Sequence, residues 1–165
     1  MLFINTNDVA VLLIDMQDYF LNEEKRKLIP NQIAVIKECK KNDVPIVVLE
    51  YSGCGETTSE LQKELKGVSN CHKLIKSSDS AFGSTRIDNL LRQLKAKTLL
   101  LMGINACACV LETGKDAVRN GYEVVTSDMI IGGYCPSCGK SNPDSWYEKN
   151  VKFLQNHLPV FQKAV

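Results

Sequence analysis

The 165-residue sequence has no long apolar run, no excess of charge of one sign and no tract of low complexity. No apolar stretch approaches the roughly 20 residues that a membrane-spanning helix needs, which argues against a membrane protein. The 20 Lys and Arg residues nearly balance the 19 Asp and Glu residues, giving a formal net charge of +1. So small a net charge produces no strong field to recruit nucleic acid or an anionic membrane. We therefore expect a small-molecule substrate, with no nucleic-acid partner and no membrane partner.

The sequence also shows no sign of a linker, and we expect no leader segment. No stretch rich in Pro, Gly and Ser and no shift in composition divides it, and its length is enough for one hydrophobic core. We expect a single domain over residues 1–165. The first residues, MLFINTNDVAVLLID, contain neither a basic leader nor a small-residue cleavage site, so a cytoplasmic location is expected.

The seven cysteines do not form the pattern of a disulfide framework. An odd number of cysteines scattered along the chain is typical of reduced thiols. Cys135 and Cys138 form a lone C-x-x-C pair, and zinc bound there would need two further ligands, for which Cys54, Cys71 and His72 are the candidates. Because no second C-x-x-C and no H-x-x-x-H is present, we expect no metal and keep this pair only as a weaker alternative.

Short apolar runs alternate with helical patterns along the chain. Runs of strand length cover residues 9–14, 45–49, 71–75, 98–102 and 122–126. Segments with apolar residues at helical spacing begin at Pro30, Ser59, Arg86 and about Cys107. Parallel strands require crossovers, and the crossovers here are predicted helices. The pattern therefore predicts an α/β fold with a mainly parallel sheet of five or six strands.

The end of the chain predicts one more helix and one more strand. Asn142, Pro143 and Asp144 are typical of a helix start. The buried side of this helix would carry Trp146, Val151, Leu154 and Leu158. Residues 158–161 are then expected to form a final edge strand.

Three of the predicted strands deliver reactive side chains to one edge of the sheet. Asp15 follows residues 9–14, Lys76 follows residues 71–75, and Cys107 and Cys109 lie in the turn after residues 98–102. Open α/β sheets place their sites at the carboxyl ends of their strands. The alternatives are a helix N-cap for Asp15, a solvated Lys76 and simple packing of the turn by the two cysteines.

The position of the two cysteines also suggests how one of them would react. Both lie at or just inside a helix N-terminus, where unpaired N–H groups and the helix dipole stabilise an anion. We therefore expect a lowered thiol pKa and backbone donors able to hold an oxyanion. The loops after the second and third strands are candidate pocket walls, so Tyr51, Phe82 and Cys107 are candidate pocket residues. For Phe82, a role as a plug of the core is an equal alternative.

Three segments, in this order along most of the chain, resemble the isochorismatase-like cysteine hydrolases. They are LLIDMQDYF around Asp15, Lys76 followed by SAF, and GINACACV followed by Thr113, Asp116 and Ala117. The resemblance implies a three-layer α/β/α Rossmann-like sandwich with a catalytic Cys-Asp-Lys triad. It also implies an oligomer, as a dimer or a tetramer.

Carried over by position, the resemblance assigns a role to each residue of the triad. Cys109 would be the nucleophile because it directly precedes the valine of the family pattern, Asp15 would be the base, and Lys76 would support the ion pair. The backbone N–H groups of Asn105 and Cys109 would form the oxyanion hole. The peptide bond between Ile104 and Asn105 would be cis.

The sequence departs from the family pattern in three places. Ala106 stands where the family has a threonine, which puts the rigidity of the turn in doubt. Nicotinamidases of the superfamily carry an Asp-x-His…His metal motif after the second strand, whereas this chain has Tyr51, Ser52 and Gly53 and no histidine there. The CPSCG segment after the fifth strand matches no part of the pattern.

These observations lead to one preferred function and two alternatives. The preferred function is hydrolysis, without a cofactor, of a small amide, ureido or related C–N bond through a thioester. Vinyl ether hydrolysis of the isochorismatase type is the first alternative. The second belongs to another class: a thiol-rich redox-sensing or metal-binding module on the same scaffold.

Overall fold

The computed structural model describes residues 2–135 and 151–163 and contains a six-stranded central sheet. The strand order is β4-β3-β2-β5-β6-β7, and every neighbouring pair is parallel. The strands are β2 (Val9–Ile14), β3 (Ile46–Tyr51), β4 (Cys71–Lys76), β5 (Thr98–Gly103), β6 (Glu123–Ser127) and β7 (Val151–Leu154). This confirms the predicted α/β fold with a mainly parallel sheet.

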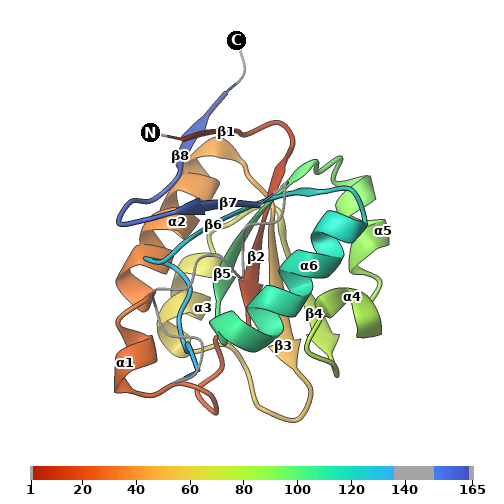
Figure 1. Ribbon diagram of the computed structural model, residues 1–165. Coiled ribbons are helices and arrows are strands. Elements are labelled where there is room, and N and C mark those ends of the chain that lie inside the picture. Colours follow the sequence, from red (N-terminus) through yellow and green to blue (C-terminus); the bar gives the residue numbers. More distant parts are fainter. Residues whose placement is uncertain (1, 136–150, 164–165) are drawn as a thin grey trace.

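Helices cover both faces of the sheet (Figure 1). They are α1 (Glu23–Arg26), α2 (Ile29–Asn42), α3 (Ser59–Leu65), α4 (Ala81–Ser84), α5 (Ile87–Gln93), η1 (Ala106–Val110) and α6 (Leu111–Arg119). The side chains of α2 and α3 pack into one core cluster, and those of α4, α5 and α6 pack into another. The predicted three-layer α/β/α sandwich is therefore confirmed.

The central position of strand β2 in the sheet explains why its sequence is apolar throughout. All six of its residues are buried. Val9, Val11 and Leu13 point into the core beneath α2 and α3, whereas the alternate residues point into the core beneath α5 and α6. A parallel strand with helices on both faces has no solvent side, so the alternation of polar and apolar residues disappears.

The predicted helix boundaries agree closely with the structure. Pro30 lies in the first turn of α2, and Asp43 ends that helix in the left-handed conformation with φ 56°. The helix expected from about Cys107 begins as the π-helical segment η1 and continues as α6. Gly121, just beyond it, has φ 90°, as expected for a glycine that ends a helix.

The prediction for the end of the chain was wrong in part. Val151–Leu154 form strand β7, which pairs with β6, rather than the buried face of a helix. Val151 and Phe153 pack with one core cluster and Leu154 with the other, the two-residue alternation of a strand. The predicted helix start at residues 142–144 and Trp146 lie outside the described residues.

The expected final strand exists but pairs elsewhere. Strand β8 (Val160–Gln162) pairs in parallel with β1 (Phe3–Asn5), forming a separate two-stranded sheet instead of an edge of the central one. Figure 1 shows the two strands together beside the described ends of the chain. No helix in the described part of the chain is long and apolar enough to cross a membrane.

Candidate active site

The carboxyl edge of the sheet brings together the three residues of the predicted triad. Asp15 directly follows β2, Lys76 is the last residue of β4, and Cys109 lies in η1 after β5. Lys76 Nζ lies 2.9 Å from Asp15 Oδ2, and both side chains are almost completely buried. The Cys109 thiol lies close enough to both groups to affect the pKa of Asp15 and to have its own pKa changed by them.

A close approach between two turns holds Asp15 beside η1. Asp15 itself has φ 53°, and its N–H donates to the carbonyl of Leu49 at 2.9 Å. Gly103 has φ 135°, and a Cβ atom there would collide with the backbone carbonyl of Ile14. The next N–H, of Ile104, donates to that same carbonyl at 3.1 Å. Only glycine lets the turn after β5 come so near the turn after β2.

Backbone bonds from the segment after β6 support the same turn. Ala106 N–H donates to the carbonyl of Gly132 at 2.7 Å, and Gly103 N–H donates to that of Ile130 at 2.9 Å. Ala106 is fully buried, so its methyl group fills core space where the family has a threonine. The peptide bond between Ile104 and Asn105 is cis, as the resemblance implied.

The ammonium group of Lys76 is buried but well supplied with acceptors. Besides Asp15, it donates to the carbonyls of Ser78 at 3.1 Å and Asp79 at 3.4 Å. It also lies 4.4 Å from the centroid of the Tyr51 ring, within the range of a cation–π interaction. These partners offset the cost of removing the ammonium group from water.

The site raises the pKa of the Cys109 thiol to about 12, mainly through burial and next through the charge of Asp15. The expected lowering of this pKa was therefore wrong. Desolvation and the neighbouring carboxylate both favour the protonated sulfur, so the resting site holds a neutral thiol at pH 7. Burial also raises the pKa of Asp15, and Lys76 and then Cys109 oppose this effect.

One oxygen of Asp15 is left open. Lys76 occupies Oδ2, whereas Oδ1 is buried and has no hydrogen-bond partner within residues 2–135 and 151–163. A buried carboxylate oxygen without a donor is unusual, because leaving such a group unpaired costs about 1–3 kcal/mol. Asp15 Oδ1 is therefore available to accept a proton in the site.

The candidate pocket residues lie in different surroundings. Tyr51 lies against Lys76, and its hydroxyl donates to the carbonyl of Ser77 at 3.2 Å. Phe82 packs with the core beneath α5 and α6, its ring centroid 6.1 Å from that of Tyr122. Cys107 is half-buried and near enough to Tyr134 to contribute to the raised pKa of that phenol.

The structure adds Gln17, which sequence reasoning missed. This buried side chain accepts from Tyr51 N–H at 2.7 Å and donates to the carbonyls of Tyr51 and Gly55 at 3.0 and 2.7 Å. It therefore fixes the loop after β3, and with it the Tyr51 ring over Lys76. A glutamine two positions after a strand-end aspartate gives no signal in a single sequence.

Asp79 was missed as well. The Cys109 thiol donates to Asp79 Oδ1 at 3.8 Å, so a second carboxylate lies beside the sulfur. A signal was present in the sequence, because Asp79 is the one ionisable residue in the SSDSAFGS loop that follows Lys76.

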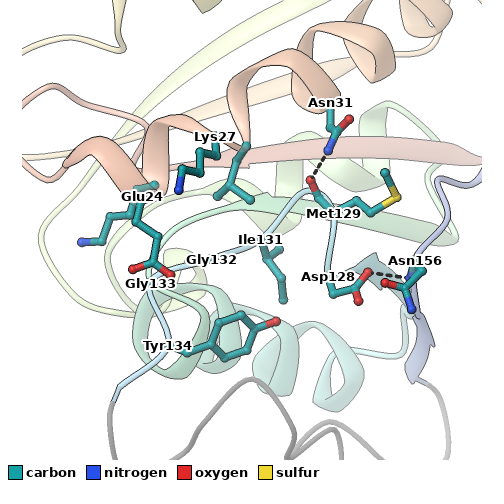
Figure 2. A pocket seen from close by; sticks show the side chains of 12 residues that line it. Glu24, Lys27, Asn31, Asp128, Met129, Ile131, Gly132, Gly133, Tyr134 and Asn156 are labelled. Atoms are coloured by element: carbon teal, nitrogen blue, oxygen red, sulfur yellow. Dashed lines mark hydrogen bonds between the residues drawn. The ribbon is translucent and has the colours of Figure 1, made fainter.

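A cavity of about 560 Å³ lies against α1, α2 and the segment after β6 (Figure 2). This segment also bonds to the turn after β5. Its walls include Ile131, Gly132 and Gly133 from the segment that supports this turn, and a Cβ atom at Gly133 would collide with the Asn105 side chain. No residue of the predicted triad lines it.

A metal site is not formed by the described residues. Within residues 2–135 and 151–163, no three His, Cys, Asp or Glu side chains are grouped to hold a metal ion. The loop after β3 starts with Ser52 and Gly53 and contains no imidazole, so it does not fit the nicotinamidase metal motif. Of the alternative pair, Cys135 is half-buried and Cys138 lies outside the described residues.

Known proteins share this architecture. Nicotinamidase 3 of Arabidopsis thaliana is 26% identical over 144 residues, covering 74% of this chain and 72% of its own length. The nicotinamidase structure from Staphylococcus aureus aligns with a TM-score of 0.82 at 17% identity, over 90% of this chain and 99% of that one. N-carbamoylsarcosine amidase from Thermoplasma acidophilum aligns with a TM-score of 0.79 at 19% identity, over 92% and 98% of the two chains.

The fold and this edge of the sheet define an α/β/α protein with a thiol, a carboxylate and a lysine gathered at the strand ends. A family model described as the isochorismatase domain matches residues 9–157. The chain therefore belongs to the isochorismatase family, and it is a hydrolase.

Proposed function

We propose that this protein hydrolyses a C–N bond of a small amide or ureido compound, with Cys109 as nucleophile, Asp15 as base and Lys76 as their charged partner. One observation carries the proposal. A buried ion pair between Lys76 and Asp15 leaves the second oxygen of Asp15 without a donor, next to a neutral thiol. A relative named a nicotinamidase and a structural neighbour named an amidase support an amide as the substrate class.

The first half of the reaction forms a thioester. Cys109 Sγ attacks the carbonyl carbon while its proton passes to Asp15 Oδ1. In this proposal the backbone N–H groups of Asn105, which precedes η1, and of Cys109, within η1, stabilise the oxyanion. When the C–N bond breaks, the leaving nitrogen takes the proton from Asp15, which releases the amine or ammonia.

The second half returns the enzyme to its starting state. Asp15 takes a proton from a water molecule as the water oxygen attacks the thioester carbon. The C–S bond then breaks, the sulfur receives that proton, and the acyl group departs as a carboxylic acid. Lys76 keeps its ion pair with Asp15 and favours the carboxylate form of Asp15 in each half.

The raised pKa of the Cys109 thiol fits this order of events. A thiol with a pKa of about 12 is not a preformed thiolate, so it must lose its proton during the attack. A carboxylate placed beside the sulfur supplies that step. Concerted transfer to Asp15 therefore replaces the activation by a helix terminus that the sequence alone predicted.

The test compares Cys109→Ala with the parent protein on a panel of small amides and ureido compounds, with ammonia release as the measurement. The expected result is loss of at least about 100-fold of the hydrolysis rate for any amide that the parent cleaves. Cys71→Ser, which changes an exposed thiol at the far end of β4, is the matched control and should retain the parent rate.

Retention of amide hydrolysis by Cys109→Ala would refute the thioester route. Cleavage of isochorismate by both proteins, with no amide cleaved by either, would favour the vinyl ether alternative instead. Mass spectrometry of the intact protein during turnover provides a second measurement, because the proposed intermediate adds the mass of the acyl group to Cys109.

A further inference from the structure

The proposed site contains more negative charge than its one cation can balance. Lys76 and Asp15 form a buried pair, 2.9 Å apart. Asp79 adds a second carboxylate, with Oδ1 3.8 Å from Cys109 Sγ. In the part of the chain that the structure describes, no lysine, arginine or histidine forms an ion pair with Asp79. Its charge therefore remains uncompensated beside the nucleophile.

Asp79 is the exposed member of the charged groups around the sulfur. Asp15 and Lys76 are buried, whereas Asp79 is exposed. Cys109 is only 7% exposed, and its thiol is close both to this exposed carboxylate and to the buried pair. A substrate carbonyl that reaches the sulfur must therefore bring its neighbouring groups close to the Asp79 carboxylate.

The loop holds Asp79 in place rather than leaving it free to swing away. Lys76 Nζ donates to the backbone carbonyls of Ser78 and Asp79 at 3.1 and 3.4 Å. Ser78 Oγ donates to the carbonyl of Ser80 at 2.9 Å. The N–H of Ala81, at the start of α4, donates to the buried Thr113 hydroxyl of α6 at 3.1 Å.

We propose that Asp79 determines specificity by charge: it favours amides that carry a cationic or N–H-rich group near the scissile carbonyl and rejects those that carry a carboxylate. This inference rests on the proposed function and narrows its substrate class. Unit charges a few ångströms apart at a protein surface interact strongly enough to change a rate about tenfold or more. Carboxylate-bearing ureido acids and dicarboxylates such as isochorismate are then poor substrates.

The same charge has a consequence for product release. Hydrolysis of a neutral amide yields a carboxylic acid, which ionises to a carboxylate at neutral pH. Repulsion between this new anion and Asp79 favours its departure from the site. A carboxylate beside the sulfur therefore distinguishes the neutral or cationic substrate from the anionic product.

The experiment measures how the charge of an incoming reagent affects its reaction with the Cys109 sulfur, and it does not depend on amide hydrolysis. Cys109 is modified by two methanethiosulfonates of similar length, the cationic 2-aminoethyl and the anionic 2-sulfonatoethyl reagent. In each case the thiolate sulfur forms a disulfide with the reagent and methanesulfinate leaves. Peptide mass spectrometry gives the rate at Cys109 for each reagent in the parent, in Asp79→Asn and in Glu123→Gln.

The expected result is a cationic-to-anionic rate ratio that falls about tenfold in Asp79→Asn and that rising salt concentration reduces in the parent. Glu123→Gln is the matched control, since it removes one exposed carboxylate at the opposite end of the sheet and should leave the ratio unchanged. Asp79→Glu should retain most of the parent preference.

Two results would overturn the inference. An unchanged ratio in Asp79→Asn would show that this carboxylate does not act on incoming charge. An equal loss of rate with both reagents would show that Asp79 activates the thiol instead of selecting by charge. Failure of the proposed function is a separate result, because it is read from amide hydrolysis by Cys109→Ala.

A substrate series adds a functional measurement. β-Alaninamide, butyramide and succinamate have similar sizes and carry a positive, neutral and negative group. For the parent, kcat/KM should be lowest for succinamate, and Asp79→Asn should raise the succinamate value relative to butyramide about tenfold.

Discussion

The Cys109 thiol lies beside two carboxylates and one ammonium group, and burial together with the charges of Asp15 and Lys76 determines when it ionises. Burial contributes most to its raised pKa, followed by the charge of Asp15, and Lys76 opposes both. Asp15 therefore hinders formation of a free thiolate while offering the oxygen that takes the proton during attack. These two effects can be separated by experiment.

Removing the charge of Asp15 should change reactivity and catalysis in opposite directions. In Asp15→Asn, the Cys109 thiol should ionise at a lower pH than in the parent, because the carboxylate that raises its pKa is gone. Amide hydrolysis should nevertheless fall at least about 100-fold, because the base is lost. Iodoacetamide labelling of Cys109 across pH, followed by mass spectrometry, tests the first part.

The control for this prediction is Asp18→Asn, which removes an exposed carboxylate paired with Arg26 just beyond the site. Its labelling profile at Cys109 should match that of the parent. A labelling pKa in Asp15→Asn that equals or exceeds the parent value would contradict the assignment of Asp15 as the neighbouring charge.

At the scale of elements, the site depends on the meeting of two turns. The turn after β5 passes so close to the end of β2 that position 103 has no room for a side chain. The loop after β3 is fixed by Gln17, which follows β2, and the loop after β4 is fixed by the Lys76 ammonium group. Each site loop is thus bonded to a neighbouring element rather than held by its own sequence.

Gly103→Ala should destabilise the fold more than a glycine-to-alanine substitution at a position with a positive φ but no steric clash. The alanine would adopt an unfavourable φ and also collide with the Ile14 carbonyl, so we expect a loss of more than about 3 kcal/mol in the free energy of unfolding. Gly121→Ala is the control, since φ there is 90° but no atom lies within 4 Å, and its loss should be about 1 kcal/mol. Urea unfolding measures both, and equal losses would contradict the close approach.

At the scale of the whole molecule, buried thiols and phenols make the fold sensitive to alkaline pH. Burial raises the pKa of Cys39 from 9.0 to about 12, and raises those of Cys109, Tyr122 and Tyr134 to about 12. Above pH 9 an unfolded thiol loses its proton while the folded one keeps it, so the folded state binds more protons. Stability therefore falls as pH rises from 9 towards 12.

Cys39→Ala should reduce this alkaline loss. With one fewer raised pKa, the free energy of unfolding should decline less steeply between pH 9 and 12, by about 1.4 kcal/mol per pH unit. The variant is less stable at the start because the substitution leaves a small cavity. Val35→Ala, also buried in α2, likewise leaves a cavity but removes no titrating group, so it should keep the parent slope. Urea unfolding at several pH values, with reductant present, gives the slopes, and equal slopes in the two variants would refute the effect.

The predicted dimer or tetramer and the cytoplasmic location stay predictions. Strand β4 is the outer strand of the central sheet on one side, and Ile75 on it is 54% exposed. Phe3 and Tyr19 are also exposed.

The sequence by itself determined the sheet, most helices and the strand ends that carry Asp15, Lys76 and Cys109, because apolar runs and helical spacing report burial directly. It failed at Val151–Leu154, where four residues fit a strand as well as a helix and only pairing with β6 decides. Tertiary structure also decided the raised pKa of Cys109 and the positions of Gln17 and Asp79. Burial and contacts between loops that are distant in the sequence produce these effects, and the local sequence predicts neither.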